Sequence, residues 1–519
     1  MVDDVASAVR TSTPTTPVTE PHLTEREVLK TSIQHDYATA ESGGIVPLDQ
    51  RRKLFSMAAL WLTMNCGFGE VFIGFQYQQA GFTLLRSLVV SLIGIGLYFA
   101  YAMPAAYIGS RTGTTHSLLA RAVFGKWGAF LVASCLLVMG TGFVGFQSYT
   151  TAQIFQGLFG WDRIMLVGII VTIVCIVNNV VGFSGVVAWA RYVVTPVVVL
   201  WIAYMMIKAF TTEPMAVLGA HPPAVTTLTT LQGIMAILGV CVWGDEPDFW
   251  RYGKPSFWWA GIGYAVGLIV GDLLFTLSGW VMAQLAITRG GDGSFANAVT
   301  FTTTYSLFGL VWLAFIVSVV SQMAAQDGNY YAAINALQGI FGGIKGWSRL
   351  YSCVIAVAVA CLATWFVIHG GDTWEAVVNF GAAAVPSATV IMVLDHYIVP
   401  KMFGMSRSLA YVPKLHEAGS ANIAAIVALL PAIVIGTVGA GTITWFGDYY
   451  WFLPGPLSWV SAGIVYLVGM AIISRTSNAM RWAGYSVQAA ANPIARSSTV
   501  EDLATLAESG RSLPLGSIA

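Results

Sequence analysis

Three acidic residues interrupt apolar stretches of the sequence. Glu70 lies within "MNCGFGEVFIG", Asp272 within "LIVGDLLFTLSGW", and Asp327 within "VSQMAAQDGNYYAAINA". Inside a lipid bilayer a carboxylate costs at least ~2.5 kcal/mol, so acidic residues there usually serve ions or substrates. A buried carboxyl can also carry a proton, because burial disfavours its ionised form. We therefore predict that all three take part in cation coupling; for Asp327 the alternative is a structural carboxylate bonded to unwound backbone.

A second candidate pair lies in the segment "GTGFVGFQSYTTAQ". Phe143 and Gln147 are four residues apart, so on a helix they share one face. The Gln147 amide offers a donor and an acceptor side by side, which suits the polar edge of a flat ring, and Phe143 can stack on its face. We predict that both bind substrate. The alternative is packing between helices, with Gln147 as the polar contact.

The composition places these residues in a membrane protein. Of the 519 residues, 56% are hydrophobic and only 10% are charged, and the mean hydropathy is +0.71. Soluble domains carry about 25% charged residues. Lys plus Arg equal Asp plus Glu at 25 each, so charge gives no indication of nucleic-acid binding. None of the six cysteines lies in a CxxC motif or at zinc-ligand spacing, so we expect neither a metal site nor a disulfide framework.

Apolar stretches long enough to cross a bilayer recur along the chain and predict an all-α polytopic protein with about twelve spans. If the N-terminus is cytoplasmic, only Arg86, Arg163, Lys208 and Arg289 fall on or near the outer side. We therefore expect both termini in the cytoplasm, with polar, disordered tails at 1–50 and 475–519. The predicted spans are 53–79, 83–108, 127–158, 163–182, 187–210, 229–251, 257–287, 301–340, 348–369, 373–398, 421–445 and 453–474.

Spans 1 and 6 each contain residues that interrupt a helix. Asn65 and Gly67 lie inside the first, and in the second Gly244 is followed at once by "DEPD". Each break lies ~14 residues, or ~21 Å of helix, from the face at which its span begins, and the two spans begin at opposite faces. This pattern predicts two inverted repeats of five helices, 51–210 and 229–398, followed by two helices at 421–474.

In span 6 we expect Asp245 and Glu246 at the break, with Asp248, Arg251 and Lys254 close to the inner water. The alternative is that the span ends at Trp243 and that "GDEPDFWRYGK" is an ordinary inner loop.

Four segments resemble the nucleobase–cation symporter-1 family, of the purine–cytosine permease type. They agree with that family in order and spacing, and the loop between spans 2 and 3 is the most specific of them. The resemblance implies a leucine-transporter-type fold and uptake of a flat nitrogen heterocycle together with a cation. The segments are "GIVPLDQRRKLF" at 44–55, "GSRTGTTHSLLARAVFGKWG" at 109–128, "EPDFWRYGK" at 246–254 and "LDHYIVPK" at 394–401.

The resemblance also implies roles for residues of span 8. It places Ala324 and Ala325 where sodium-coupled members have two hydroxyl residues that bind the ion. Because alanine has no side-chain oxygen, a sodium site is in doubt, unless a shifted register brings Ser318 and Ser321 to these positions. A proton is therefore favoured over sodium.

The same resemblance places Gln326 at the amide that contacts substrate, with Asn329 as a further polar candidate. At Phe143 and Gln147 the family has an aromatic residue, usually tryptophan, and a glutamine. Trp243 and Asn65, beside the two breaks, complete the substrate-binding candidates. For Trp243 a lipid-facing or interfacial position is the alternative.

These observations predict an importer in the plasma membrane whose substrate is a nucleobase or a related heterocycle, such as cytosine, a purine, uracil or allantoin. An amino-acid or amine symporter of the same fold is the alternative. The sequence contains no HExxH motif, Gly-rich phosphate loop or Cys/His pair, so a membrane enzyme is not indicated. We expect no cofactor besides the coupling ion, and the oligomeric state stays open.

Overall fold

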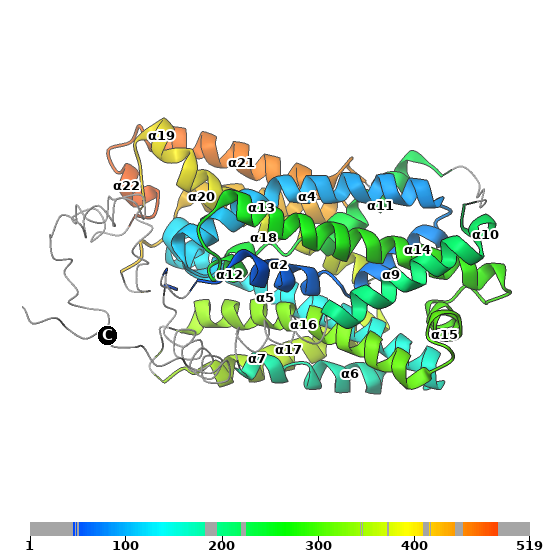
Figure 1. Cartoon of the computed structure of the whole chain (residues 1–519). Helices are drawn as coiled ribbons and strands as arrows, with labels where there is room; N and C mark the ends of the chain where they lie inside the picture. The colour runs from blue at the N-terminus through cyan, green and yellow to red at the C-terminus, as the bar shows by residue number, and fades with distance from the viewer. Residues whose placement is uncertain are drawn as a thin grey trace, which may run out of the picture.

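Helices form nearly all of the computed structural model. It describes residues 45–46, 48, 51–181, 195–218, 225–342, 344, 346–370, 373–407, 415, 417–441 and 450–485. Within these ranges, extended pairing is limited to two isolated bridges, Arg52–Gly253 and Asn422–Ala483. Most helices run along the long axis of one bundle (Figure 1).

The first half of the chain forms predicted spans 1–5, with the short helix α10 after them. Span 1 consists of two helices, and span 3 is a 44-residue helix that bends at Gly125, where φ is 73°. The helices are α2 (Leu54–Met64), α3 (Phe68–Gln79), α4 (Leu84–Thr112), α5 (His116–Phe159), α6 (Ile164–Val174), α7 (Val177–Val181), α9 (Thr195–Thr212) and α10 (Pro214–Leu218).

The second half forms predicted spans 6–12. Span 6 is again two helices, and span 7 contains a π-helical turn between two α-helices. The elements are α11 (Thr227–Cys241), α12 (Glu246–Trp250), α13 (Phe257–Val266), η3 (Gly267–Leu273), α14 (Leu274–Thr288), α15 (Phe295–Ser306), α16 (Val311–Phe341), α17 (Arg349–His369), α18 (Thr373–Tyr397), α19 (Val399–Phe403), α20 (Ile423–Val438), α21 (Pro454–Ile473) and α22 (Ala479–Trp482).

The lengths and compositions of these helices suit a membrane. Among the described residues, eight helices are long and apolar enough to cross one, and the bent pair α2–α3 makes a ninth. Three shorter apolar helices, Ile164–Val174, Pro196–Thr212 and Ile423–Val438, account for the other predicted spans.

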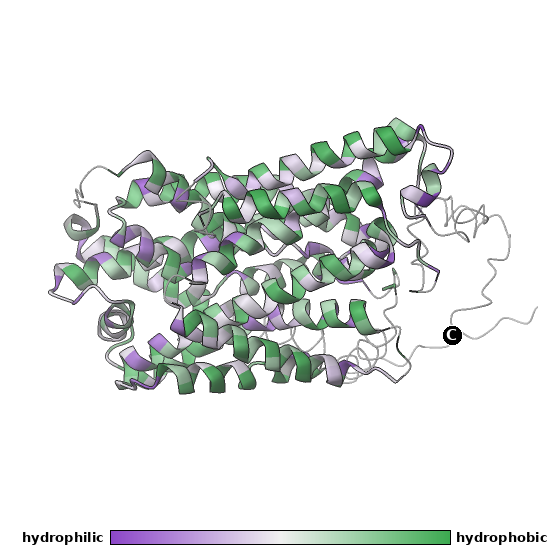
Figure 2. Cartoon of the chain, turned by 180° about the vertical axis from the view of Figure 1, so that it is seen from behind, coloured by the Kyte–Doolittle hydropathy of each residue, from purple (hydrophilic) through white to green (hydrophobic). Residues whose placement is uncertain are grey.

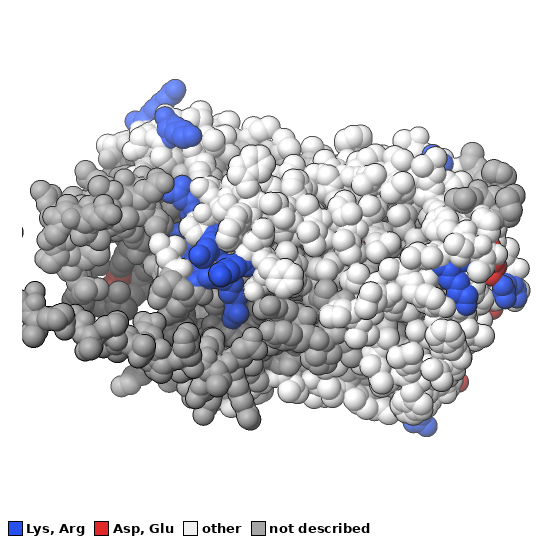
Figure 3. All heavy atoms as spheres, in the orientation of Figure 1, with Lys and Arg blue, Asp and Glu red and all other residues white. Residues whose placement is uncertain are grey.

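The outer surface of the bundle is apolar. On α21, Val460, Ile464, Val468 and Ile472 repeat every four residues, and all are exposed. Figure 2 shows hydrophobic residues along most of the length of the outer helices. In the face seen in Figure 3, charged side chains lie toward the two ends and a band without them lies between. A surface of this kind suits contact with lipid.

Span 8 differs from its prediction. The stretch 301–340 is not one helix, because α15 ends at Ser306 and α16 begins at Val311. Between them Phe308 and Gly309 have φ values of 56° and 73°, which no helix accommodates. Apolar composition alone does not distinguish a short helix at the bundle end from the first turns of a span.

Part of the predicted C-terminal tail is folded. Helix α22 lies within 475–519, and Ala483 and Tyr485 are buried after it. Arg407 pairs with Asp395 at 2.7 Å, donates to the Ala483 carbonyl at 2.6 Å and lies 3.9 Å from the centre of the Tyr485 ring. Most of both predicted tails lies outside the described residues.

Candidate functional site

Span 1 is interrupted where the sequence predicts it. Helix α2 ends at Met64, α3 begins at Phe68, and the two are bent by 48°. A Cβ atom on Gly67 would lie 2.8 Å from Glu70 Oε2 and 3.2 Å from the Ala325 Cβ. Glycine is therefore the residue that lets the break pack against α16.

Helix α16 supplies the partners that the interrupted backbone lacks. Ser321 Oγ donates to the Cys66 carbonyl at 2.6 Å, and the Phe68 N–H donates to Gln322 Oε1 at 2.9 Å. Non-helical backbone inside a membrane is tolerated only where such partners or water satisfy it. Ser321 therefore reaches the break, and Ala325 packs against it.

Span 6 is interrupted between Cys241 and Glu246. Gly244 has a φ of 74°, and its carbonyl accepts hydrogen bonds from Tyr101 OH at 3.0 Å and Thr389 Oγ1 at 2.6 Å. Glu246 accepts from the Gly244 N–H at 3.1 Å and from Tyr98 and Tyr101 at 3.0 and 2.8 Å. The break is therefore fixed by α4 and α18.

The acidic residues after this break are not in an ordinary inner loop. Asp245, Glu246 and Asp248 are fully buried, and Arg251 is 1% exposed. Asp248 accepts hydrogen bonds from the His116 N–H and from Asn335 Nδ2. The expectation that Asp248 and Arg251 lie close to water is wrong, because α12 packs between α4, α5 and α16. Lys254 alone is exposed as expected.

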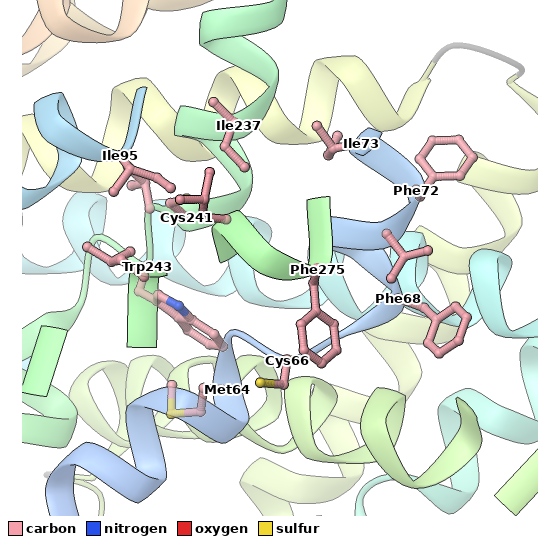
Figure 4. Close-up of a cluster of buried hydrophobic side chains, with 14 of the residues drawn as sticks. Met64, Cys66, Phe68, Phe72, Ile73, Ile95, Ile237, Cys241, Trp243 and Phe275 are labelled. Atoms are coloured by element: carbon pink, nitrogen blue, oxygen red, sulfur yellow. The ribbon is translucent and has the colours of Figure 1, made fainter. Parts of the chain in front are cut away.

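The two breaks meet through Trp243 and Asn65. Trp243 Nε1 donates to Asn65 Oδ1 at 3.0 Å, and the Trp243 ring packs edge-on to Trp61 at 6.2 Å. Figure 4 shows Trp243 beside Met64, within the buried cluster around the first break. A Cβ on Gly328 of α16 would lie 2.5 Å from the Trp243 ring. The lipid-facing alternative for Trp243 is therefore wrong.

Gln147 lies on α5 opposite the first break. Its side-chain carbonyl accepts from Asn329 Nδ2 at 3.2 Å, and its backbone carbonyl accepts from Gln322 Nε2 at 2.9 Å. No described residue accepts a hydrogen bond from the Gln147 amide nitrogen. Phe143, one turn earlier, packs against Gly381 of α18. Phe143, Gln147, Trp243 and Asn329 are all buried, with 4–6% exposure.

Two predicted residues of α16 point elsewhere. Gln326 is fully buried and donates to Ser148 Oγ at 3.2 Å, within the interface of α5 with α6 and α17. Asp327 lies beside Asn179 of α7, whose amide donates to the Asp327 backbone carbonyl at 3.0 Å. Successive helical residues are rotated by about 100° around the axis. Gln326 and Asp327 therefore point away from the face of α16 that carries Ala325 and Asn329.

The two remaining acidic candidates lie near the first break. Glu70 is in the first turn of α3 and Asp272 is in η3, and both are buried. Gln322, which joins α16 to both the break and α5, is not among the residues predicted from the sequence. Its seven-residue spacing from Asn329, two helical turns, is the signal that places both on one face.

Comparisons with known proteins agree with this architecture. The family described as permeases for cytosine/purines, uracil, thiamine and allantoin matches residues 46–471. No significant match to a curated protein was found.

Among solved structures, Mhp1, a nucleobase–cation-symport-1 family transporter in a closed conformation with bromovinylhydantoin bound, is 17% identical. Its TM-score is 0.65, with 87% of this chain and 96% of that chain covered. The inward-facing conformation of Mhp1 gives a TM-score of 0.63 at 16% identity, covering 84% and 94%. A Na⁺-coupled sialic acid symporter in a substrate-bound outward-open state gives 0.55 at 11% identity, covering 85% and 95%.

The structural matches confirm the predicted leucine-transporter-type fold, and the family match spans nearly every described helix. This integral membrane protein therefore belongs to the family of permeases for cytosine/purines, uracil, thiamine and allantoin, the nucleobase–cation symporter-1 type.

Proposed function

We propose that this protein is a plasma-membrane symporter that imports a nucleobase or a related nitrogen heterocycle with a proton, both termini lying in the cytoplasm. The observation that carries the proposal is the Gln147–Asn329 amide pair, which lies across from the break in span 1. Transport, rather than catalysis, is the role that two interrupted helices around a central site support.

The side chains around Gln147 suit a flat, neutral ring with polar edges. Gln147 has an uncommitted amide nitrogen, and Asn329 also carries a side-chain carbonyl. Phe143, one turn from Gln147 on α5, and Trp243, beside Gly328 of α16, are the aromatic residues that could stack on the ring. A site built to hydrogen-bond a ring edge rejects rings whose donors and acceptors do not match, because buried polar groups then stay unpaired.

The chemistry of the break supports a proton over sodium. The Ser321 hydroxyl is committed to the Cys66 carbonyl, and Ala324 and Ala325 provide no side-chain oxygen. Glu70, in contrast, places an ionisable group in the first turn after the break. In the alternative function, as an amine or amino-acid symporter, Glu70 would instead pair with a substrate ammonium group.

An uptake competition panel tests the proposal. The purified protein in lipid vesicles takes up radiolabelled cytosine, or another heterocycle that it accumulates, in the presence of excess uracil, adenine, allantoin, leucine or a simple amine. We expect the heterocycles to compete and the amino acid and amine to have no effect. Competition by the amine alone would contradict the proposal and support the alternative.

A further inference from the structure

A π-helical turn faces the break in span 1. The turn η3 approaches α2 through two glycines: a Cβ on Gly271 would lie 2.6 Å from the Asn65 carbonyl oxygen, and one on Gly267 would lie 3.1 Å from that of Trp61. Turns of this type occur often at functional sites. Asp272 follows Gly271 directly, so η3 brings a carboxyl group to the break.

Asp272 and Glu70 are buried acids with few partners. Asp272 is 0% exposed and Glu70 is 3% exposed. The Cys241 thiol lies against Asp272, and the Gly67 backbone lies against the Glu70 carboxylate. Across the described ranges, neither carboxylate oxygen of Asp272 meets a nitrogen or oxygen donor at hydrogen-bond distance, and Oε2 of Glu70 has no partner. The ion pairs among the described residues are Arg289–Glu213 and Arg407–Asp395. Neither Glu70 nor Asp272 is therefore paired with a described Lys or Arg side chain. Asp272 and Glu70 interact electrostatically with each other.

The polar groups around these two acids are thiols and an amide. The buried thiols of Cys66 and Cys241 interact electrostatically with both carboxyls. The Asn65 amide nitrogen, beside Gly267, is also buried without a partner. Among the described residues no group of His, Cys, Asp and Glu side chains is arranged to hold a metal ion.

We propose that Glu70 and Asp272 share one proton and that this pair binds the proton that drives transport. The inference rests on the proposed symport function. Two unpaired carboxylates in a dry site repel each other, and each ion costs several kcal/mol. A single proton on the pair removes one of the two charges and with it the repulsion.

The pair is connected to the substrate site through Gln322. Gln322 donates to the Gln147 carbonyl and accepts from the Phe68 N–H, and Phe68 begins the helix turn that carries Glu70. A change in the position of α3 therefore alters both the proton pair and the backbone of Gln147. Substrate and proton are coupled because each stabilises the same position of the break.

Carboxyl titration by difference infrared spectroscopy tests the shared proton without a substrate. We expect the purified protein to show protonated carboxyls at neutral pH, and the component of this signal that the pair contributes to be lost in both Glu70→Gln and Asp272→Asn. Asp292→Asn, at an exposed acid, is the control and should leave the signal unchanged. If the signal persists in both variants, the proposal is contradicted.

Binding and transport measurements on the same variants test the coupling. For a substrate that binds only the protonated carrier, Kd rises about tenfold per pH unit above the pKa of the pair. We expect this dependence in the wild type and in Asp292→Asn, and its loss in Glu70→Gln and Asp272→Asn, which should still exchange labelled for unlabelled substrate across the membrane.

Glu70→Asp and Asp272→Glu keep the ionisable groups and should retain pH-dependent binding. If they do, the loss of pH dependence in Glu70→Gln and Asp272→Asn is not due to misfolding. If the wild type exchanges no heterocycle, the proposed function is contradicted. The infrared titration still shows in that case whether Glu70 and Asp272 share a proton. If Asp272→Asn accumulates substrate along a proton gradient as the wild type does, the coupling role of the pair is contradicted.

Discussion

At the scale of single residues, the site depends on amide groups whose partners are only partly supplied by the protein. Gln147 accepts from Asn329, and we propose that its amide nitrogen donates to the substrate. Gln322 differs, because its three contacts, to Phe68, Gln147 and Thr150, hold the helices together.

Gln147→Ala should weaken substrate binding by about tenfold to a hundredfold, because it removes a donor to the substrate and one of the two acceptors of the Asn329 amide, which keeps only the Ala325 carbonyl. Gln153→Ala is the matched control, since Gln153 lies on the same helix and contacts Tyr149. Calorimetric titration of the two purified variants with substrate measures the difference. Equal affinities of the two variants for the substrate would show that Gln147 does not bind it.

The sequence predicts single residues unevenly. Gln147 and Asn329, predicted separately, contact each other. Gln326 and Asp327, predicted beside them, instead contact Ser148 of α5 and Asn179 of α7. The direction of a side chain on a helix buried on all sides depends on which neighbour lies where, and apolar periodicity does not supply that.

At the scale of the elements, close approach of helices positions the broken spans. A Cβ on Gly74 of α3 would lie 1.7 Å from the Thr276 carbonyl oxygen of α14, and one on Gly279 would lie 1.9 Å from that of Val71. Small residues at such interfaces let helix backbones touch inside a membrane. Spans 1 and 7, which carry Glu70 and Asp272, are therefore packed backbone to backbone.

Gly74→Ala should lower the apparent melting temperature in detergent, because overpacking a tight contact costs about 1–3 kcal/mol or more. Gly96→Ala lies in a helix with nothing within 4 Å of the added Cβ, so it should be neutral or slightly stabilising. A thermal-shift assay measures the melting temperatures of both variants. A stable Gly74→Ala protein would show that α3 and α14 are not in this contact.

Gly244→Ala tests the second break. The substitution places a side chain at a φ of 74° and 2.8 Å from the Val385 Cβ, so strain and crowding of about 1–3 kcal/mol are expected. Gly404→Ala shares the left-handed backbone, with a φ of 66°, but has nothing within 4 Å. Transport by Gly244→Ala should fall further than by Gly404→Ala; equal activity would contradict a packed break at Gly244.

Both breaks were predictable because glycine, asparagine and acidic residues are unfavourable inside a membrane helix. The division of 301–340 into α15 and α16 was not, since Phe308 and Leu310 are as apolar as residues of a span. The π-helical turn of η3 could not be predicted from the sequence either, because a turn of this type does not require a glycine or a proline.

At the scale of the whole molecule, a clamp of four residues holds the end of span 10 to the C-terminal segment. Arg407 pairs with Asp395, Tyr466 donates to Asp395, and Tyr485 covers the guanidinium. The clamp lies at the same end of the bundle as α19 and α22 (Figure 1).

Arg407→Ala should lower stability by about 3–5 kcal/mol, because it leaves the Asp395 carboxylate buried without its cation. Lys401→Ala, at an exposed lysine of α19, should change little. Denaturation of both variants in the same detergent measures the effect. A small effect of Arg407→Ala would show that the clamp does not hold the C-terminal segment.

The orientation in the membrane follows from the distribution of Lys and Arg and can be tested directly. In a protein whose native cysteines are replaced, Lys254→Cys and Asp292→Cys introduce thiols at exposed positions. With cytoplasmic termini, an impermeant maleimide applied to intact cells should label the cysteine at 292 and not the one at 254. The reverse pattern would invert the topology.

Concentrative uptake tests the central claim most directly. Vesicles that contain the protein are given an inwardly directed proton gradient without sodium, and the internal and external concentrations of a labelled heterocycle are compared at steady state. We expect internal accumulation that collapses when an ionophore dissipates the gradient. Equal concentrations on both sides under the proton gradient, with accumulation only when a sodium gradient is imposed, would contradict it.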